Sequence, residues 1–291
     1  MLKKVKPIIE KFPLIANFYR FIRDSYALTR KAKSTPYGFL WKGNKSILDG
    51  TFEPEEIKIA SFFLEQVDQL INIGANQGLY SCLALSKNKK VMAFEPDPLN
   101  LKYLIKNIQI NNWVSSIEVY PVAVSNKNGL EKLYGSSFGA SLISGWGNNN
   151  NKLYKLIPTI KLDIFVINKF QPYRNLIIID IEGAEQKLLD GCPNLLNCDL
   201  KPIWIVEISI EEHQPKGFSI NPNLVKTFQT FFGKGYRSFS ADKNIQEIKL
   251  EQIKDIYKSK KNTLSTHNFI FLDQSYSEND LSDLRTFMKN K

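Results

Sequence analysis

Acidic side chains gather at the ends of two apolar segments, residues 176–181 and 202–208, that we predict to be neighbouring buried strands. A buried carboxylate costs free energy unless it is paired, hydrogen-bonded or bound to a metal ion. Acids in such positions are therefore candidates for chemistry. These acids, together with a histidine in the loop after the second segment, are Asp180, Glu182, Glu185, Glu207 and His213.

Two chemistries fit this group, and the sequence leaves both open. In the first, Asp180 and Glu207 bind Mg²⁺, which prefers oxygen ligands and would acidify a substrate hydroxyl. In the second, no metal is present; His213 or Glu182 acts as a general base, and the remaining acids are hydrogen-bonded anchors. The chain has two histidines. His267 begins a predicted core strand and is expected to be structural, so His213 is the better candidate for a base.

A turn containing glycines lies upstream of these acids. Residues 70–80 are typical of a buried strand, a glycine turn and a helix start, and residues 91–97 of a second strand that ends in an acid. That acid, Glu95, lies 21 residues beyond Gly74. This is close to the ~20 residues at which a strand-helix-strand unit presents a carboxylate to a nucleotide ribose. The pattern indicates a cofactor-binding half-fold.

The glycine spacing also indicates which cofactor is bound. A dinucleotide fingerprint beginning at Gly74 requires glycine at the positions of Asn76 and Leu79, because the backbone must approach a pyrophosphate closely. A nucleoside without phosphates fits better, and S-adenosylmethionine is such a ligand. Its ribose hydroxyls suit Glu95, and its amino-acid group suits the turn. The structural alternative is a turn that joins strand to helix without binding a cofactor.

Apolar and turn patterns alternate along the chain as in a doubly wound α/β sheet. Seven principal strands are predicted, at residues 69–74, 90–95, 117–124, 176–181, 202–208, 236–240 and 268–272, with a further short strand at 156–162. Helices are predicted at residues 53–66, 78–86, 99–110, 184–190 and 224–232. Ligands of such sheets bind outside the carboxyl ends of the strands, where the strand order reverses. This rule brings the glycine turn and the acids to one edge.

Two segments interrupt the regular order. Residues 126–155 contain five glycines and a run of four asparagines, which indicates a loop insertion with at most a short hairpin. Within it, residues 139–142 are a candidate substrate lid, and a surface insertion without that role is the alternative. Residues 243–267 form a second, charged insertion, which is predicted to hold one helix.

The composition is typical of a cytoplasmic globular protein. With 291 residues, of which 43% are hydrophobic, the chain can bury one large core and carry an extension. Its three cysteines form no C-x-x-C pair, which argues against a disulfide framework or a structural zinc site. No apolar run approaches the ~18 residues of a membrane span, and no signal-peptide pattern is present. We therefore expect a cytoplasmic location.

The net charge of +10 belongs almost entirely to an N-terminal extension, residues 1–45, with eleven lysines and arginines against two acids. Apolar residues recur at helical spacing from Leu14 and basic residues lie off that stripe, so a basic amphipathic helix is predicted. This helix would contact an anionic membrane or an acidic partner, or it would pack on the core. The remaining residues, 46–291, form the predicted catalytic domain and are nearly neutral, so a nucleic-acid partner is unlikely.

Six ordered blocks of the chain form a specific set. They are residues 72–80 (NIGANQGLY), 93–98 (AFEPDP), 123–126 (AVSN), 139–142 (GASL), 157–163 (IPTIKLD) and 180–185 (DIEGAE). With these blocks the chain resembles the FkbM-type methyltransferases, a family of class I S-adenosylmethionine enzymes, over about residues 50–273. The resemblance implies a Rossmann-like class I sheet and methylation of hydroxyls in sugars, glycolipids or natural products.

The resemblance also implies roles for the matching residues. The cofactor-binding residues would be Asn72, Gly74, Asn76 and Gly78 on the methionine side, Glu95 at the ribose and Ala123 near the adenine. The residues facing the transferred methyl group would be Asp180, Glu182 and Glu207. Two positions depart from the family pattern. The first block opens with Asn72 in place of Asp, and Ile178 replaces a Lys two residues before Asp180.

Together these features predict an S-adenosylmethionine-dependent O-methyltransferase that transfers a methyl group in line to a small-molecule or glycan acceptor. The two departures motivate an alternative, a catalytically degenerate scaffold for cofactor binding or glycan assembly. Methylation of nucleic-acid bases is disfavoured, because the chain has D-I-E-G where such enzymes commonly carry [DN]-P-P-[FYW]. A dehydrogenase is less favoured still, because it would bind nicotinamide without the fingerprint glycines.

Overall fold

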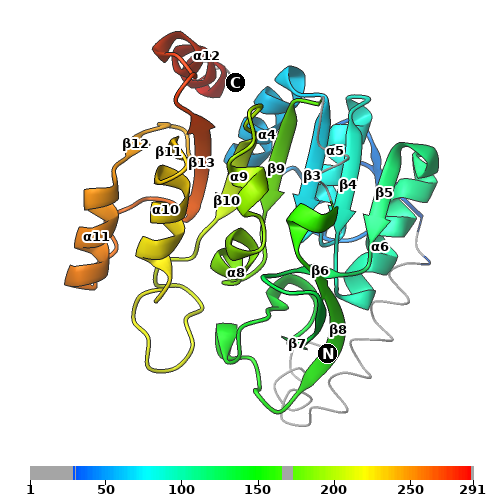
Figure 1. Ribbon diagram of the computed structural model, residues 1–291. Helices are drawn as coiled ribbons and strands as arrows, with labels where there is room; N and C mark the ends of the chain where they lie inside the picture. Colours follow the sequence, from blue (N-terminus) through cyan, green and yellow to red (C-terminus); the bar gives the residue numbers. More distant parts are fainter. Residues whose placement is uncertain (1–28, 30, 166–172, 290–291) are drawn as a thin grey trace.

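The computed structural model describes residues 29, 31–165 and 173–289 (Figure 1). The amphipathic helix predicted from Leu14 lies outside these residues, and the division of the chain at residue 45 stays a prediction. Part of the segment 1–45 packs on the domain: Phe39 and Trp41 are buried in its core. They belong to a small hairpin, β1 (Lys33–Ser34) and β2 (Leu40–Trp41), which the short helix α3 (Lys45–Leu48) follows.

An eight-stranded sheet forms the centre of the molecule. Its strands are β3 (Gln69–Ile73), β4 (Lys90–Phe94), β5 (Ile117–Tyr120), β9 (Asn175–Ile179), β10 (Ile203–Glu207), β11 (Tyr236–Ser240), β12 (Glu247–Ile248) and β13 (Asn268–Asp273). They are ordered β12-β11-β13-β10-β9-β3-β4-β5. The strands β5, β4, β3, β9 and β10 are parallel, and β13 is antiparallel to both of its neighbours. The predicted doubly wound fold is confirmed, and β12 adds an eighth strand to the seven principal ones.

The strand order reverses between β3 and β9. From β3 the chain builds β4 and β5 toward one edge, and from β9 it builds β10 toward the other. The N–H of Asp180, just after β9, donates to the carbonyl oxygen of Ile73 at the end of β3, at 3.0 Å. The glycine turn and the acidic segment therefore meet at the reversal, where sheets of this kind bind ligands.

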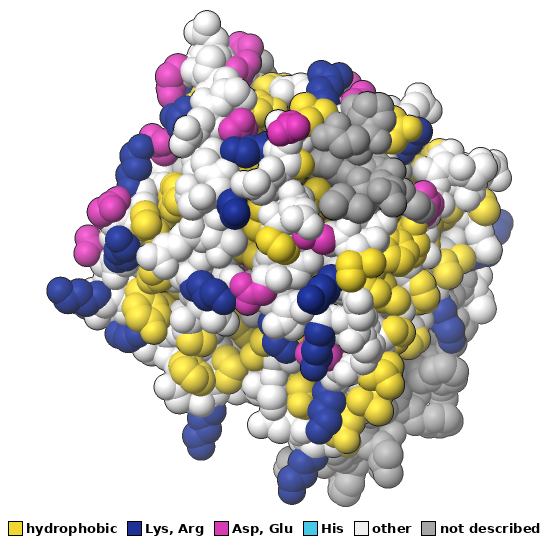
Figure 2. All heavy atoms as spheres, in the orientation of Figure 1, with side chains coloured by type: hydrophobic (Ala, Val, Ile, Leu, Met, Phe, Trp, Pro, Cys, Tyr) yellow, Lys and Arg dark blue, Asp and Glu magenta, His cyan; other side chains and the backbone are white. Residues whose placement is uncertain are grey.

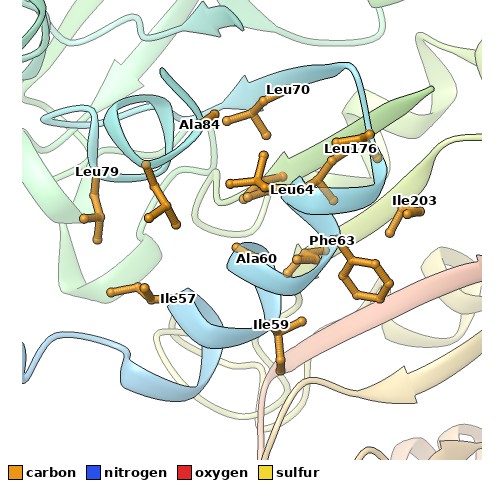
Figure 3. Close-up of a cluster of buried hydrophobic side chains, with 14 of the residues drawn as sticks. Ile57, Ile59, Ala60, Phe63, Leu64, Leu70, Leu79, Ala84, Leu176 and Ile203 are labelled. Atoms are coloured by element: carbon orange, nitrogen blue, oxygen red, sulfur yellow. The ribbon is translucent and has the colours of Figure 1, made fainter. Parts of the chain in front are cut away.

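Helices cover both faces of the sheet (Figure 1). One face carries α4 (Pro54–Gln66), α5 (Leu79–Ser86), α6 (Pro98–Ile110) and α12 (Glu278–Lys289). The other carries α8 (Glu185–Asp190), α9 (Pro193–Leu196), α10 (Leu224–Phe232) and α11 (Leu250–Ser259). Because successive strand residues point to opposite faces, Leu70 packs in the first core and Ile71 in the second. Figure 3 shows Leu70, Leu176 and Ile203 of three strands beside Phe63 and Leu64 of α4.

A second, three-stranded sheet lies beyond the carboxyl ends of the central strands (Figure 1). It consists of β6 (Ala123–Val124), β8 (Tyr154–Ile160) and β7 (Gly129–Tyr134), in that order. The single strand predicted at residues 117–124 is therefore wrong. It is divided between two sheets, β5 and β6, around Pro121, whose missing N–H cannot contribute to a ladder.

The predicted insertions have more structure than the sequence indicated. In residues 126–155, β7 pairs with β8 along its whole length of six residues. The strand predicted at 156–162 is β8, and it belongs to this small sheet. In residues 243–267, α11 is accompanied by β12, which extends the central sheet. The C-terminal helix α12, which was not predicted, packs against α4. In the described part of the chain, no helix is long and apolar enough to cross a membrane.

Candidate active site

A pocket of about 550 Å³, partly open to solvent, lies at the reversal of strand order. Its walls come from the glycine turn, the end of β4, the small sheet with its connecting loop, and the segment after β9. The lining residues are Ile73, Gly74, Asn76, Phe94, Glu95, Pro96, Asn100, Val122, Ala123, Val124, Leu133, Ser137, Phe138, Ala140, Leu142, Asp180, Ile181 and Glu182.

The glycine turn is held against both neighbouring strands. The N–H groups of Gly74 and Ala75 both donate to the carbonyl oxygen of Phe94, at 3.0 Å. Gly74 has φ +80°, and a Cβ placed on it would lie 1.8 Å from the carbonyl oxygen of Asp180. A side chain at this position would therefore collide with backbone. Gly74 sets the close approach between the turn and the acidic segment.

Glu95 is buried beside the turn, and its carboxylate accepts three hydrogen bonds. Its Oε2 accepts from the N–H of Asn76 at 2.7 Å, and its Oε1 accepts from the N–H of Asp97 at 2.7 Å and from Asn100 Nδ2 at 3.4 Å. Burial raises the pKa of Glu95 to about 7, and these N–H donors oppose the rise. Since a carboxylate offers about four acceptor positions, Glu95 has room for one more donor.

Two further acceptors flank Glu95. In the part of the chain that the structure describes, no donor reaches the buried oxygens Asn76 Oδ1 and Asn100 Oδ1. Both residues line the pocket, and Asn100 is 2% exposed. A buried acceptor without a donor costs free energy, which a bound ligand with hydroxyl or amino groups would recover. The sequence analysis did not identify Asn100.

The other predicted cofactor residues divide between the pocket and its support. Ala123 of β6 lines the pocket. Gly78 does not; it precedes α5 with φ +94°, and an added Cβ would lie 2.5 Å from Leu104 Cδ1. Asn72 also lies outside the lining, and its side-chain amide donates to Ser81 Oγ on α5 at 2.9 Å. Gly78 and Asn72 therefore support the turn without lining the pocket.

Asp180 and Glu182 form the acidic wall of the pocket. Burial, followed by the charges of Glu182 and Glu53, raises the pKa of Asp180 well above its ordinary value. Glu182 has φ +55°, and its Oε2 accepts from Trp146 Nε1 at 2.7 Å. Its carbonyl oxygen accepts from Ser141 Oγ at 2.6 Å. The loop between β7 and β8 therefore holds Glu182 in place.

His213 lies behind Glu182 and outside the pocket lining. Its Nδ1 is 3.7 Å from Glu182 Oε2, its ring is edge-on to Trp146 at 6.3 Å, and its side chain is 59% exposed. Glu185 is also outside the lining, because its carboxylate turns back to accept from the N–H of Gly183 at 2.8 Å.

Glu207, at the end of β10, does not line the pocket but belongs to the same group of charges. Burial, followed by the charges of Asp180 and Glu182, raises its pKa well above the ordinary value. Its Oε1 lies 3.8 Å from Nε2 of His267, the histidine expected to be structural.

Glu53 is a member of this group that the sequence analysis missed. It has φ +41° at the start of α4, and its Oε2 accepts from the hydroxyl of Tyr80 on α5 at 2.7 Å. Burial raises the pKa of Glu53 to about 7, and its charge raises the pKa values of both Asp180 and Glu207. The available signal was an acid before a helix-starting proline, Pro54, which is also the pattern of an ordinary helix start.

The predicted magnesium site at Asp180 and Glu207 finds no support in the structure. Among the described residues, no three or more histidine, cysteine, aspartate or glutamate side chains are arranged to hold a metal ion. Three of the acids have other partners: Trp146 Nε1 donates to Glu182, the Tyr80 hydroxyl donates to Glu53, and His267 lies 3.8 Å from Glu207.

The chain is similar in part to known methyltransferases. The hexuronic acid methyltransferase AglP of Haloferax volcanii is 29% identical over 147 residues, which are 50% of this chain and 58% of that protein. The chain therefore matches less than two thirds of the length of this relative. Among solved structures, the FkbM methyltransferase of Methylobacillus flagellatus KT has a TM-score of 0.34 at 18% identity, covering 66% of this chain and 49% of that one. A SAM-dependent methyltransferase of Agrobacterium tumefaciens has a TM-score of 0.44 at 12% identity, with 84% and 69% covered.

A family comparison covers most of the pocket. The methyltransferase FkbM domain matches residues 72–238, more than half of the chain, and this range runs from the glycine turn past His213. The protein therefore belongs to the FkbM methyltransferase family.

Proposed function

We propose that the protein transfers a methyl group from S-adenosylmethionine to a hydroxyl of a sugar-containing acceptor. One observation carries the proposal: a single pocket joins the adenosine-type wall, Glu95 with Asn76 and Asn100, to the acidic wall, Asp180 and Glu182. The sulfonium and the acceptor oxygen would then meet between the two walls. A glycolipid or a natural product with a sugar-like hydroxyl satisfies the same chemistry.

In the cofactor half, Glu95 takes one ribose hydroxyl at its remaining acceptor position. The second hydroxyl donates to Asn100 Oδ1, because Asn100 is bonded to Glu95 and its oxygen is otherwise without a donor. The turn at residues 74–78 contacts the amino-acid end of the cofactor, and Ala123 contacts the adenine. S-adenosylmethionine supplies an electrophilic methyl group on a positively charged sulfur.

In the acceptor half, the residues align the hydroxyl and receive its proton. Asp180 is the general base, because it lines the pocket and its raised pKa makes its carboxylate a stronger base. Glu182, fixed by Trp146, orients the hydroxyl, and His213 supports Glu182 from the solvent side. The acceptor oxygen bonds to the methyl carbon as the carbon–sulfur bond breaks, and the proton passes to Asp180. Alignment of this kind can contribute about 7–11 kcal/mol.

The sugar acceptor has two supports. The relative AglP is by name a hexuronic acid methyltransferase. The acceptor wall is polar and acidic, and carboxylates are acceptors for the several hydroxyl donors that a sugar presents. The match to AglP covers half of the chain, so the acceptor itself is a matter for experiment.

Labelled S-adenosylmethionine and extracts of the source cell, analysed by mass spectrometry for a methylated product, test the proposal. Asp180→Ala is expected to lower turnover at least a hundredfold while leaving the affinity for S-adenosylhomocysteine nearly unchanged. Unchanged turnover in that variant would remove the site assignment. A scaffold that does not use the cofactor would give no heat in a calorimetric titration with S-adenosylmethionine or S-adenosylhomocysteine.

A further inference from the structure

The small sheet presents an apolar face to solvent. In the β7–β8 pairing, Leu130 faces Pro158, Lys132 faces Leu156 and Tyr134 faces Tyr154, so these six side chains share one face, called the outer face below. Leu130 is 65% exposed, Leu156 62% and Tyr154 46%. The opposite face is buried through Leu133 and Ile157. Sheets with one solvated face normally place polar residues on it, so the outer face departs from the usual pattern.

Exposed apolar clusters of this kind mark interaction sites more often than scattered single residues do. Five of the six outer-face side chains are apolar or aromatic, and the sixth, Lys132, has its Nζ 4.2 Å from the centre of the Tyr154 ring. The outer face therefore combines an apolar centre with an ammonium group.

The surroundings of the outer face are basic. Residues 126–161 contain five lysines and one acid. That acid, Glu131, points away from the outer face and pairs with Lys187 at 2.9 Å. Lys127, Lys152 and Lys161 lie next to the strand ends in sequence. Figure 2 shows dark blue lysines among yellow apolar side chains on the part of the surface where Figure 1 places the small sheet.

The same hairpin forms one wall of the pocket. Its connecting loop supplies Ser137, Phe138, Ala140 and Leu142 to the lining. Phe138 is also 40% exposed, so it reaches from the pocket toward the surface. Whatever binds the outer face is therefore held close to the pocket.

We propose that the outer face docks on an anionic lipid surface. Leu130, Leu156 and Tyr154 enter the boundary between headgroups and acyl chains, and the lysines lie at the level of the lipid phosphates. Charge identifies the occupant of the outer face. The segment 1–45 is itself strongly basic, and a second copy of the chain would bring a second set of lysines. The lysines around the outer face therefore repel both. An anionic surface is attracted by each of these groups.

A consequence concerns the acceptor, and this part rests on the proposed function. With the outer face on lipid, the adjoining pocket wall faces molecules anchored in that surface. The favoured acceptor is then a sugar attached to a lipid, and a free sugar in solution is disfavoured.

Co-sedimentation of the full chain with vesicles of equal parts phosphatidylcholine and phosphatidylglycerol tests the docking. The unchanged protein should bind these vesicles, bind pure phosphatidylcholine much less, and lose affinity as salt is raised. Leu130→Ser/Leu156→Ser should weaken binding roughly tenfold or more, because two apolar contacts are lost. Val114→Ser is the matched control: Val114 is 67% exposed, and it lies beside β5, outside the small sheet. Thermal unfolding of each variant shows that the fold is kept.

Three outcomes overturn the docking. The unchanged protein could fail to bind anionic vesicles, or the double variant could bind as tightly as Val114→Ser, which would place binding elsewhere, for example in residues 1–45. Alternatively, sedimentation velocity could reveal a dimer that the double variant abolishes, which would assign the face to a second copy. Titration with S-adenosylhomocysteine is independent of all three, so a failure of the proposed function is recognised separately.

Discussion

Asn72 and Ile178 lie directly opposite each other on the adjacent parallel strands β3 and β9. Both point to the face covered by α4 and α5, where Asn72 bonds Ser81 and Ile178 is buried in the core. The family pattern has Asp and Lys at these two positions, which are opposite charges. The two departures therefore occupy one paired position on adjacent strands, and neither position lines the pocket.

A double-mutant cycle tests this pairing. Ile178→Lys alone buries an ammonium without a partner and is expected to lower the free energy of unfolding by about 3–5 kcal/mol. Adding Asn72→Asp should recover a large part of that loss, with a coupling of roughly 1–3 kcal/mol. Denaturant unfolding of the four proteins measures the coupling. Additive losses would show that the two positions act independently.

Gly74→Ala should damage both the fold and the cofactor site. The added methyl group would meet the Asp180 carbonyl at a φ that disfavours side chains, and backbone on both sides cannot move away easily. We expect a loss of about 3 kcal/mol or more in unfolding free energy and a weaker affinity for S-adenosylhomocysteine. Gly139→Ala is the control, because a Cβ there meets nothing within 4 Å. Equal behaviour of the two variants would contradict the close packing of the turn.

Stability should decrease with rising pH in the weakly acidic range. Glu53, Glu95 and Glu185 have an ordinary pKa of 4.5, which burial raises to about 7 in the folded protein. Between these values the folded state binds more protons than the unfolded state, so the free energy of unfolding falls as pH rises through about 7. Urea unfolding across this interval measures the slope. Glu53→Gln should make it shallower, whereas Glu251→Gln, at an exposed site on α11, should leave it unchanged.

Trp146→Phe isolates the hydrogen bond to Glu182. Phenylalanine keeps most of the buried packing but has no indole N–H, so Glu182 loses the donor that fixes it. A bond to a charged group contributes about 1.5–3 kcal/mol, so turnover should fall by about tenfold or more. The affinity for S-adenosylhomocysteine should stay unchanged. Trp113→Phe, in the aromatic contact with Phe39 on the other face, serves as the control. A loss of cofactor affinity without a loss of turnover would contradict this assignment, because it would place the effect of Trp146 in the cofactor half of the pocket.

Asn100→Leu tests the proposed contact with the ribose, and the test changes both the protein and the ligand. The variant should bind S-adenosylhomocysteine about tenfold more weakly, since one hydrogen bond to a buried acceptor is lost. With 2′-deoxyadenosine and 3′-deoxyadenosine as probes, the loss should disappear for the nucleoside that lacks the relevant hydroxyl. Equal losses for all three ligands would mean that Asn100 acts only through Glu95. Asn100→Ser serves if the leucine variant folds poorly, and Asn111→Leu is a control on the same helix.

The central sheet could be predicted because its strands carry strong local signals. The buried run 176–179 is continuously apolar, and the run 70–73 is apolar except for Asn72. Helix starts such as Asp97-Pro98 are marked by a cap and a proline. The small sheet could not be predicted, because β7 and β8 pair across a glycine- and asparagine-rich loop whose composition is that of an unstructured insertion. Pro121 was the local sign that the strand before it ends.

The candidate site was predicted in part, for a related reason. Glu95, Asp180 and Glu182 follow strands, and strand ends at a reversal of order converge. Glu53, Asn100 and Trp146 do not follow strands: they lie at a helix start, in the first turn of a helix and in a loop. They join the site through contacts over long sequence distances, such as that of Trp146 with Glu182. Only the folded chain brings such residues together.

The lysine links of the small sheet have a consequence for engineering. Lys155 of β8 pairs with Asp97, the cap of α6, and Lys187 of α8 pairs with Glu131 of β7. The strands of the hairpin are thus fastened at two points to the helices α6 and α8, whereas Phe138, Ala140 and Leu142 reach the pocket from the loop between the strands. We expect that residues 138–153 can be exchanged for those of a relative with the strand register kept. The backbone at Ser137 must stay in place, because its carbonyl oxygen accepts from Asn100 Nδ2 at 3.3 Å. The acceptor range of such chimeras would be a modular property, inherited with the loop.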